Sequence, residues 1–362
     1  MKKLINDPEN VTREQLEGFS RAHSDLVTVH FDPTYVARAA GKPGAPACIG
    51  GERVAVISGG GSGHEPLHAG FVGAGMLDAA CPGALFTSPT PDQMYEAAKN
   101  VSGPRGTLFI VKNYTGDIMN FQMASDMLRD EGMHVRTVVI DDDVAVKDSL
   151  YTAGRRGTGT TLFAEKICGA AAAAGYDLDR LSELCWKVSR RGKSMGVALR
   201  SCVLPSSGKA SFELPEDTIE IGIGIHGEPG IERRAIMSAD AITQLLADRI
   251  IDDGAYTRSL SDWDDEHGEW REIEVVDERF EPGDSFIALV NGMGGTPVSE
   301  LYTVYAKLDE VVKSRGMRIA RSLVGSYITS LEMQGCLITL LKADDELVRL
   351  WDAPVHTAAL RW

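Results

Sequence analysis

Alternating blocks of apolar and polar positions divide the first half of the chain into predicted strands and helices. Short apolar runs bounded by glycine or polar residues predict strands, and apolar positions three or four residues apart predict helices. The pattern predicts helices at 11–24, 91–101, 118–130, 161–174 and 178–189, and strands at 53–58, 107–112 and 135–140. Strands that alternate with helices in this way form parallel β-α-β units. We therefore predict an N-terminal α/β domain over residues 1–190.

The pattern beyond residue 190 predicts a second α/β domain over residues 191–362. Its predicted strands lie at 194–199, 218–225, 286–290, 317–323 and 336–341, and its predicted helices lie at 239–252 and 298–315. An acidic stretch with tryptophans at 261–272 is typical of a solvated loop or hairpin. The expected fold class is α/β, with two domains whose sheets are mixed or mostly parallel and an active site near their junction.

The composition narrows the class of protein without naming a function. Of the 362 residues, 43% are hydrophobic and 25% are charged, as in ordinary globular proteins. The formal charge of −15 disfavours nucleic acid and acidic membranes as partners, because both need a basic face. No apolar run is long enough to span a membrane and no signal-peptide core follows the first residues, so we expect a cytoplasmic protein. The six cysteines show no CxxC or zinc-ligand spacing, which predicts reduced thiols in the core.

Polar residues follow three predicted strands at their carboxyl ends. They are Gly61, Ser62 and His64 after strand 53–58, Lys112 and Asp117 after strand 107–112, and His226 after strand 218–225. Ligands of open parallel sheets bind beyond the carboxyl ends of the strands. We therefore predict that these three loops form one ligand site.

Two glycine-rich segments come close to nucleotide-binding motifs but lack the required context. Residues 222–227 have the spacing GxGxxG, yet the glycines lie inside a predicted strand and Pro229 follows too closely for a helix. Residues 154–161 resemble a Walker A loop, with Thr160 in place of the phosphate-binding lysine. A helix N-terminus capped by threonines explains this segment better, with Arg155 and Arg156 as candidates to face a partner.

A third segment approaches the nucleophile elbow of hydrolases. Residues 60–64 match GxSxG except that His64 stands in the last position. A hydrolase with Ser62 as nucleophile is therefore the second enzyme class to consider, and it would need its own acid, base and oxyanion hole.

Four motifs together resemble the family of dihydroxyacetone kinase substrate-binding subunits. They are SGGGSGHEP at 58–66, VKNYTGD at 111–117, GIGIHGEPGI at 222–231 and LWDAPVHTAALRW at 350–362. Each glycine loop is a weak signal alone, whereas four motifs in this order and spacing are specific. The resemblance covers essentially the whole chain. We expect a bacterial stand-alone subunit, because the chain ends where a nucleotide-binding domain would otherwise begin.

The resemblance implies a role for each candidate site residue. His226 matches the histidine that forms a covalent hemiaminal with C2 of dihydroxyacetone, and His64 matches a general acid/base. Asp117 matches the residue that binds the reacting hydroxyl and takes its proton. The residues that match the pocket for the other substrate oxygens are Gly61, Ser62, Gly63, Ser88 and Lys112. Three other histidines are expected to be structural, namely His68, His134 and His356.

The resemblance also implies that this chain binds no cofactor and no metal of its own. ADP or ATP with Mg²⁺ is expected on a nucleotide-binding kinase subunit (DhaL-like), which a phosphotransferase-system donor (DhaM-like) recharges in many bacteria. Transfer driven by phosphoenolpyruvate is thus favoured over direct use of ATP. The missing Walker A lysine agrees with this, and a homodimer is expected by resemblance.

A covalent bond suits dihydroxyacetone because hydrogen bonds alone bind so small and polar a ligand weakly. Glycerol presents nearly the same hydroxyls but no electrophilic carbon, so only the ketone can react. The nucleophile must be an uncharged imidazole nitrogen, which histidine offers near neutral pH. Phosphoryl transfer then depends mainly on the positioning of the reacting hydroxyl and on charge stabilisation.

Several alternatives remain open at the level of sequence. The chain could be a dihydroxyacetone sensor or coactivator without kinase activity, although intact His64 and Asp117 favour an enzyme. A related ketose such as erythrulose could be the substrate. Asp117 could cap a helix that begins near Ile118, and Lys112 could pair with a neighbouring acid.

Overall fold

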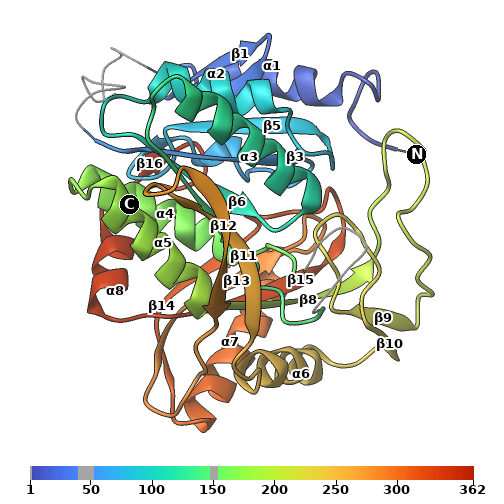
Figure 1. Cartoon of the computed structure of the whole chain (residues 1–362). Helices are drawn as coiled ribbons and strands as arrows, with labels where there is room; N and C mark the ends of the chain where they lie inside the picture. The colour runs from blue at the N-terminus through green and yellow to red at the C-terminus, as the bar shows by residue number, and fades with distance from the viewer. Residues whose placement is uncertain (1, 40–52, 147–153) are drawn as a thin grey trace.

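The computed structural model describes residues 2–39, 53–146 and 154–362, which form two six-stranded sheets with helices between and outside them (Figure 1). One sheet uses strands between residues 27 and 140, and the other uses strands between residues 192 and 342. The predicted division at residue 190 thus falls between the two sheets. The predicted class, α/β with mixed sheets, is confirmed.

The first sheet has the order β1-β2-β5-β3-β6-β7. Its strands are β1 (Val27–Phe31), β2 (Thr34–Arg38), β3 (Ala55–Ser62), β5 (Ala79–Leu85), β6 (Thr107–Lys112) and β7 (Val135–Ile140). The strands β5, β3, β6 and β7 run parallel, whereas β1 and β2 pair antiparallel. The carboxyl ends of β3 and β6 therefore lie side by side at one edge of the sheet.

The second sheet has the order β10-β9-β8-β15-β13-β14. Its strands are β8 (Gly192–Arg200), β9 (Thr218–Ile221), β10 (Glu232–Ala235), β13 (Ser285–Gly292), β14 (Arg318–Gly325) and β15 (Gln334–Lys342). Every neighbouring pair is antiparallel except β13 and β14. This sheet therefore does not follow the parallel pattern of the first.

Helices cover both faces of each sheet. They are α1 (Val11–Ala22), α2 (Pro91–Val101), α3 (Thr115–Asp130), α4 (Thr160–Ala173), α5 (Leu178–Arg191), α6 (Ala239–Ile251), α7 (Val298–Ser314) and α8 (Asp345–Asp352). The helices α2 and α3 pack on the outer face of the first sheet, and α6 and α7 pack on the outer face of the second. The helices α4 and α5 contact strands of both sheets and form the layer between them.

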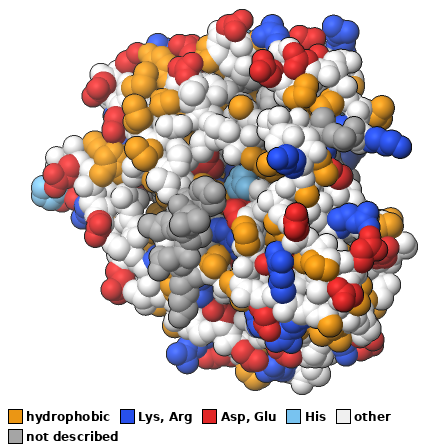
Figure 2. All heavy atoms as spheres, turned by 90° about the vertical axis from the view of Figure 1, so that its right-hand side faces the viewer, with side chains coloured by type: hydrophobic (Ala, Val, Ile, Leu, Met, Phe, Trp, Pro, Cys, Tyr) orange, Lys and Arg blue, Asp and Glu red, His pale blue; other side chains and the backbone are white. Residues whose placement is uncertain are grey.

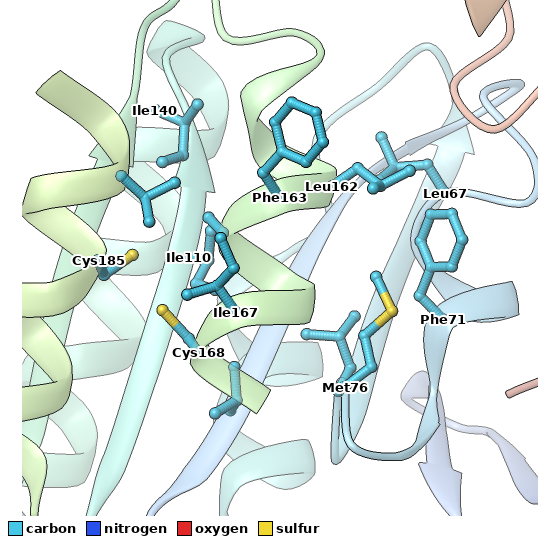
Figure 3. Packing of buried hydrophobic residues seen from close by; sticks show 14 of the residues in the cluster. Leu67, Phe71, Met76, Ile110, Ile140, Leu162, Phe163, Ile167, Cys168 and Cys185 are labelled. Atoms are coloured by element: carbon cyan, nitrogen blue, oxygen red, sulfur yellow. The ribbon is translucent and has the colours of Figure 1, made fainter. Parts of the chain in front are cut away.

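The position of α4 between the two sheets explains its composition. A helix that packs on all sides is mostly apolar all round, and every residue of α4 except Ala173 is buried, including the charged Glu165 and Lys166. Figure 3 shows Leu162 and Ile167 of this helix packed among Ile110, Leu67 and Phe71. The hydrophobic cluster around α4 also includes residues of the second sheet, so the two sheets share one core.

Two small pairings complete the fold. The acidic segment predicted as a loop or hairpin is a hairpin, formed by β11 (Thr257–Asp264) and β12 (Glu269–Val276). Near the C-terminus, β16 (His356–Thr357) pairs with β4 (Gly73–Ala74), which follows the short helix η1 (Ala69–Phe71). The C-terminal segment therefore packs against the N-terminal half of the chain.

Asp142 joins the end of β7 to α4 and to β8. Its carboxylate accepts hydrogen bonds from the backbone N–H groups of Thr158 (2.6 Å) and Thr160 (2.8 Å) and from the Ser194 hydroxyl. The Ser194 N–H also donates to the Asp142 carbonyl at 2.8 Å. The N-terminus of α4 is thus capped by a distant aspartate, and the prediction that threonines cap it is wrong.

Arg155 and Arg156 do not face a partner, contrary to the prediction, because both are buried. Arg155 donates to Asp253 at 2.7 Å, and Arg156 donates to Asp143 at 2.8 Å and to the Gly222 carbonyl at 2.7 Å. The partner carboxylates lie far away in the sequence or across a turn, so the sequence alone could not reveal them. The two arginines instead link buried segments of the chain to one another.

No helix within the described ranges is long and apolar enough to cross a membrane. The cysteines at 81, 168, 185, 202 and 336 are buried free thiols, as predicted. Cys48 lies outside the described residues.

Candidate active site

The glycine-rich segment after residue 58 continues strand β3, which ends at Ser62 and not at Ser58 as predicted. Glycine is required here because neighbours approach the backbone closely. A Cβ atom on Gly60 would lie 2.1 Å from Lys112 Nζ, and one on Gly61 would lie 2.7 Å from the Thr87 backbone nitrogen. The strand therefore brings bare backbone against Lys112.

His64 follows β3 and is fully buried. Its Nδ1 is 2.8 Å from the Thr329 carbonyl oxygen, which can only accept, so Nδ1 carries the proton. Nε2 has no hydrogen-bond partner among the described residues. Burial, followed by His226 and Lys112, lowers the pKa of His64 well below its usual value. The ring is thus a neutral imidazole with a free Nε2 that can accept a proton.

His226 lies in a turn of the second sheet, and the predicted strand that should carry it is shorter than expected. The strand β9 ends at Ile221 because Gly222 adopts a left-handed conformation with φ of +76°. The strand is antiparallel to both neighbours, so His226 does not lie at the carboxyl edge of a parallel sheet. The His226 ring nevertheless lies 4.6 Å from the His64 ring, centroid to centroid, so these two loops meet.

Glu228 contacts both the backbone and the ring of His226. Its Oε2 accepts from the His226 backbone N–H at 2.9 Å, and its Oε1 lies 3.4 Å from Nδ1. Burial opposes ionisation of Glu228, but the His226 side chain and the positive charge of Arg156 lower its pKa to about 2. The contact therefore places a carboxylate, which can only accept a hydrogen bond, beside His226 Nδ1.

Lys112 and Asp117 occupy the end of β6 and the first turn of α3. Lys112 Nζ lies 3.8 Å from Asp117 Oδ2 and donates to the Gly59 carbonyl at 3.3 Å. Asp117 is buried, and its Oδ1 has no hydrogen-bond partner within the described part of the chain. The helix begins at Thr115, so Asp117 is not the N-cap that the sequence suggested as its alternative role. A helix N-terminus favours the negative charge of Asp117.

The remaining predicted pocket residues are placed in different ways. The Ser62 hydroxyl donates to the Gly83 carbonyl at 2.7 Å, so it ties β3 to β5 and is not a free nucleophile. Gly63 has φ of +105°, and its N–H lies 3.1 Å from the Glu65 carboxylate. Ser88 is half-buried beside the N-terminus of α3, where a Cβ atom on Gly116 would lie 2.7 Å from its Oγ. Ser88 thus lies near Asp117.

Sequence reasoning missed two aromatic residues that wall the site. The Tyr114 ring lies 4.4 Å from the His226 ring, and its buried hydroxyl has no hydrogen-bond partner in the described ranges. Phe86 stacks on His64 at 5.1 Å and contacts His226 edge-on at 5.5 Å. Tyr114 could have been found from its place in the VKNYTGD motif, whereas no sequence signal marks Phe86.

Sequence reasoning also treated His68 as structural, but the structure places it next to a site residue. His68 Nε2 lies 2.7 Å from Lys112 Nζ. The other structural predictions hold for His134, which is exposed, and for His356, which lies in β16.

The site is partly open to the surface. Figure 2 shows a histidine side chain near the centre of this face, at the bottom of a depression. The side chain of His226 is 17% exposed, whereas that of His64 is fully buried. No group of three or more His, Cys, Asp or Glu side chains in the described residues could hold a metal ion. The site thus combines two imidazole rings, a carboxylate and an amine within a largely buried space.

Comparison with known proteins identifies similar chains. The family model described as the Dak1 domain matches residues 17–359. The chain is 53% identical over its full length to "PEP-dependent dihydroxyacetone kinase, dihydroxyacetone-binding subunit DhaK" of Escherichia coli (strain K12), and covers 99% of that protein. It is 43% identical over 99% of its length to "PTS-dependent dihydroxyacetone kinase 1, dihydroxyacetone-binding subunit DhaK" of Listeria innocua, and covers 100% of it.

Solved structures show the same fold. The native dihydroxyacetone kinase of C. freundii superposes with a TM-score of 0.83 at 29% identity, over 99% of this chain. This chain spans 60% of that longer kinase. The "Dihydroxyacetone kinase operon co-activator Dha-DhaQ" superposes with a TM-score of 0.80 at 29% identity, over 96% of both chains.

Proposed function

The chain belongs to the Dak1 domain family, and on this premise we propose that it is the dihydroxyacetone-binding subunit of a multi-subunit dihydroxyacetone kinase. The observation that carries the proposal is the pairing of two imidazole rings from different sheets. The His226 and His64 rings lie 4.6 Å apart, centroid to centroid; His64 Nδ1 donates to the Thr329 carbonyl, and His226 Nδ1 faces the Glu228 carboxylate. One can attack a carbonyl while the other handles a proton.

His226 Nε2 attacks C2 of the ketone and forms a hemiaminal. The attack places positive charge on the ring, and Glu228 stabilises that charge through Nδ1. The former carbonyl oxygen takes a proton from solvent, because the neutral His64 ring carries none on Nε2, and His64 Nε2 then accepts a hydrogen bond from the new hydroxyl. The aromatic walls of Tyr114 and Phe86 keep the adduct away from water.

Asp117 then prepares a terminal hydroxyl for phosphorylation. Its free Oδ1 accepts the hydroxyl proton as the oxygen attacks the phosphorus atom. The backbone around Gly61 and Gly63, with Ser88 and Lys112, holds the other oxygens. The covalent bond at C2 holds the hydroxyl in place for transfer. This positioning supplies most of the increase in rate.

The phosphoryl group comes from a partner subunit. The relatives are named as subunits of phosphoenolpyruvate- or phosphotransferase-system-dependent kinases, which implies partner subunits. We assign ADP or ATP with Mg²⁺ to a nucleotide-binding partner, recharged by a phosphotransferase-system donor, and we expect a homodimer.

The test is reconstitution of the chain with its nucleotide-binding partner. Dihydroxyacetone phosphate should form with the partner and a phosphoenolpyruvate-driven donor system, and should not form from ATP and this chain alone. Erythrulose and glycerol serve as comparison substrates. Phosphorylation of glycerol at the same rate would overturn the covalent mechanism, because glycerol cannot form a hemiaminal.

A regulatory role is the second candidate function, and one observation favours it. The co-activator protein shares the fold over 96% of this chain at 29% identity. A sensor needs a covalent anchor such as His226 but no base for phosphoryl transfer. The buried Asp117 beside Lys112 therefore supports the kinase role over a purely regulatory one.

A further inference from the structure

Glu165, His68 and Lys112 form a buried chain of hydrogen bonds that ends beside Asp117. Lys112 Nζ lies 2.7 Å from His68 Nε2, and His68 Nδ1 lies 2.5 Å from Glu165 Oε1. On its other side Lys112 Nζ lies 3.8 Å from Asp117 Oδ2. None of the four residues is more than 4% exposed. The contacts thus connect helix α4 to the candidate active site through the protein interior.

The buried position of Glu165 is unfavourable for a carboxyl group. It lies in the middle of α4, and its neighbours Leu162 and Ile167 pack into the core between the sheets (Figure 3). A carboxyl group there loses its hydration, which destabilises the protein unless a partner compensates. Only one oxygen of Glu165 is hydrogen-bonded within the described part of the chain, since Oε2 has no partner. Such a group suggests a role in the chemistry.

The chain of contacts has two proton arrangements with the same total charge. In the first, the Lys112 ammonium donates to His68 Nε2, and His68 Nδ1–H donates to the Glu165 carboxylate. In the second, the Glu165 carboxylic acid donates to His68 Nδ1, and His68 Nε2–H donates to a neutral Lys112 amine. The two arrangements differ by the movement of two protons, and His68 is neutral in both.

Burial and the charge of Asp117 favour opposite arrangements. Burial raises the pKa of Glu165 to about 8, and burial also lowers the pKa of Lys112, so both effects favour the second arrangement. The negative charge of Asp117 raises the pKa of Lys112 and favours the first. Burial, Lys112 and His64 together lower the pKa of His68 well below its usual value, which excludes an imidazolium.

The groups that face this chain of contacts are few. The charged or titratable neighbours are Asp117 and His64, both of which act on Lys112 or His68 from the site. The Ser58 hydroxyl lies 3.1 Å from His68 Nδ1 and donates to the Ile110 carbonyl at 2.8 Å. Asp117 is therefore the neighbour whose charge acts directly on Lys112, whereas His64 acts on His68.

We propose that Glu165 and His68 are positioning residues that match the charge of Lys112 to the charge of Asp117. The inference rests on the proposed function, in which Asp117 takes a proton from the substrate hydroxyl. While Asp117 is a carboxylate, it keeps Lys112 as an ammonium. When Asp117 becomes protonated, one proton moves from Lys112 Nζ to His68 Nε2 and another moves from His68 Nδ1 to Glu165 Oε1.

The shift conserves protons and leaves no buried charge unpaired. Lys112 becomes a neutral amine, Glu165 becomes a carboxylic acid, and His68 exchanges one ring proton for another. After the product leaves, loss of the proton from Asp117 reverses the shift. The hydrogen-bonded series of Lys112, His68 and Glu165 thus avoids an isolated buried ammonium, which would be unfavourable, when Asp117 loses its negative charge.

The direct test is nuclear magnetic resonance of the whole chain at pH 7, which needs no kinase activity. Asp117→Asn imitates a protonated Asp117 without changing its shape. The Lys112 ¹⁵Nζ signal should move from the ammonium toward the amine position, and the Glu165 ¹³C carboxyl signal should move toward the acid position. An unchanged Lys112 signal, or a Lys112 that changes while Glu165 stays ionised, would overturn the inference.

Kinetics in the reconstituted kinase give the second test. Since general acid–base groups contribute about 100- to 10,000-fold, loss of their support in Glu165→Gln or His68→Asn should lower kcat by roughly 10- to 100-fold. KM should stay within about twofold, because His226 still holds the substrate. Thr161→Val removes a buried hydroxyl of α4 that has no partner in the described residues, and should leave both constants unchanged.

The outcomes separate this inference from the proposed function. A raised KM with an unchanged kcat in Glu165→Gln and His68→Asn would show a merely structural role and overturn the inference. If the wild-type chain fails to phosphorylate dihydroxyacetone with any partner, the proposed function fails. The magnetic resonance experiment then still decides whether the charges of Lys112 and Asp117 are coupled through Glu165.

Discussion

His64 and His226 face each other across the site, yet the fold holds them in different ways. His64 comes from the parallel sheet, is fully buried, and is fixed by the backbone carbonyl of Thr329. His226 comes from a turn of the mainly antiparallel sheet, is partly exposed, and is fixed by the carboxylate of Glu228. A neutral acceptor fixes a tautomer without favouring a charge, whereas a carboxylate stabilises an imidazolium.

The difference assigns the two rings to different tasks. A nucleophilic histidine becomes positively charged as it attacks, so a carboxylate behind it lowers the barrier. A base must remain neutral until it receives its proton, which burial and a carbonyl partner achieve for His64. In the proposed mechanism, the environment of each ring therefore suits His226 to act as the nucleophile and His64 to act as the base.

Of the changes that test the difference between His226 and His64, His226→Ala should have the largest effect. Because no other described group offers the same anchor, the covalent adduct should disappear and turnover should fall by about 10,000-fold or more. Mass spectrometry of the intact protein at low temperature and a crystal soaked in dihydroxyacetone both detect the adduct. His134→Ala, a change at an exposed histidine, is the control. A persisting adduct in His226→Ala would contradict the assignment.

Asp117→Asn should separate attachment from transfer. The adduct on His226 should form normally, while kcat falls about 1,000-fold because the amide cannot take the hydroxyl proton. Asp130→Asn, at the other end of α3, is the matched control and should retain full activity. Normal turnover in Asp117→Asn would remove this residue from the chemistry.

His64→Asn tests the base directly. The variant keeps a polar side chain but has no Nε2, so formation of the adduct and turnover should each slow by about 100-fold. Stopped-flow measurement of adduct formation and steady-state kinetics report the two steps. An effect on transfer alone would show that His64 does not act at C2.

Glu228→Gln tests whether the carboxylate beside His226 supports it, and should have the smallest effect of these variants. The amide still contacts His226 but cannot balance its charge, so adduct formation should weaken by roughly tenfold, in line with hydrogen bonds to charged groups. Equilibrium titration with dihydroxyacetone measures this loss. An unchanged affinity would show that the carboxylate charge does not support the nucleophile.

The same variant has a defined effect on stability. The pKa of Glu228 is about 2 in the folded protein and 4.5 in the reference state, so ionisation stabilises the fold above pH 4.5. This contribution is lost as the pH falls from 4.5 toward 2. The free energy of unfolding should therefore differ most between wild type and Glu228→Gln at pH 7, and the difference should shrink at pH 3.5. Urea denaturation at both values checks the sign.

The parts of the fold that sequence reasoning predicted well are those in which local pattern and packing agree. The strands β6 and β7 and the helices α2 and α6 lie at or within one residue of their predicted ranges, because each has one clear apolar pattern. The predicted meeting of His64, Asp117 and His226 rested on their places after three strands. The rings of His64 and His226 do lie side by side, although the strand before His226 is antiparallel to its neighbours.

The parts that it could not predict depend on contacts between distant segments. Glycine disfavours strands, so nothing local indicated that β3 continues to Ser62, where Lys112 and Thr87 leave no room for a side chain. The antiparallel neighbours of β9 are likewise invisible in its own residues. His68 looked structural because its partner Glu165 lies on another element, 97 residues away.

Asp142 has a consequence for how the molecule unfolds. Its carboxylate bonds both α4 and Ser194 of β8, so the first sheet, the central helices and the second sheet are tied at one buried point. The shared hydrophobic cluster around α4 joins the same three layers. Neither half can open alone without exposing that cluster, so heating should produce one cooperative transition and the two histidines should lose their geometry together.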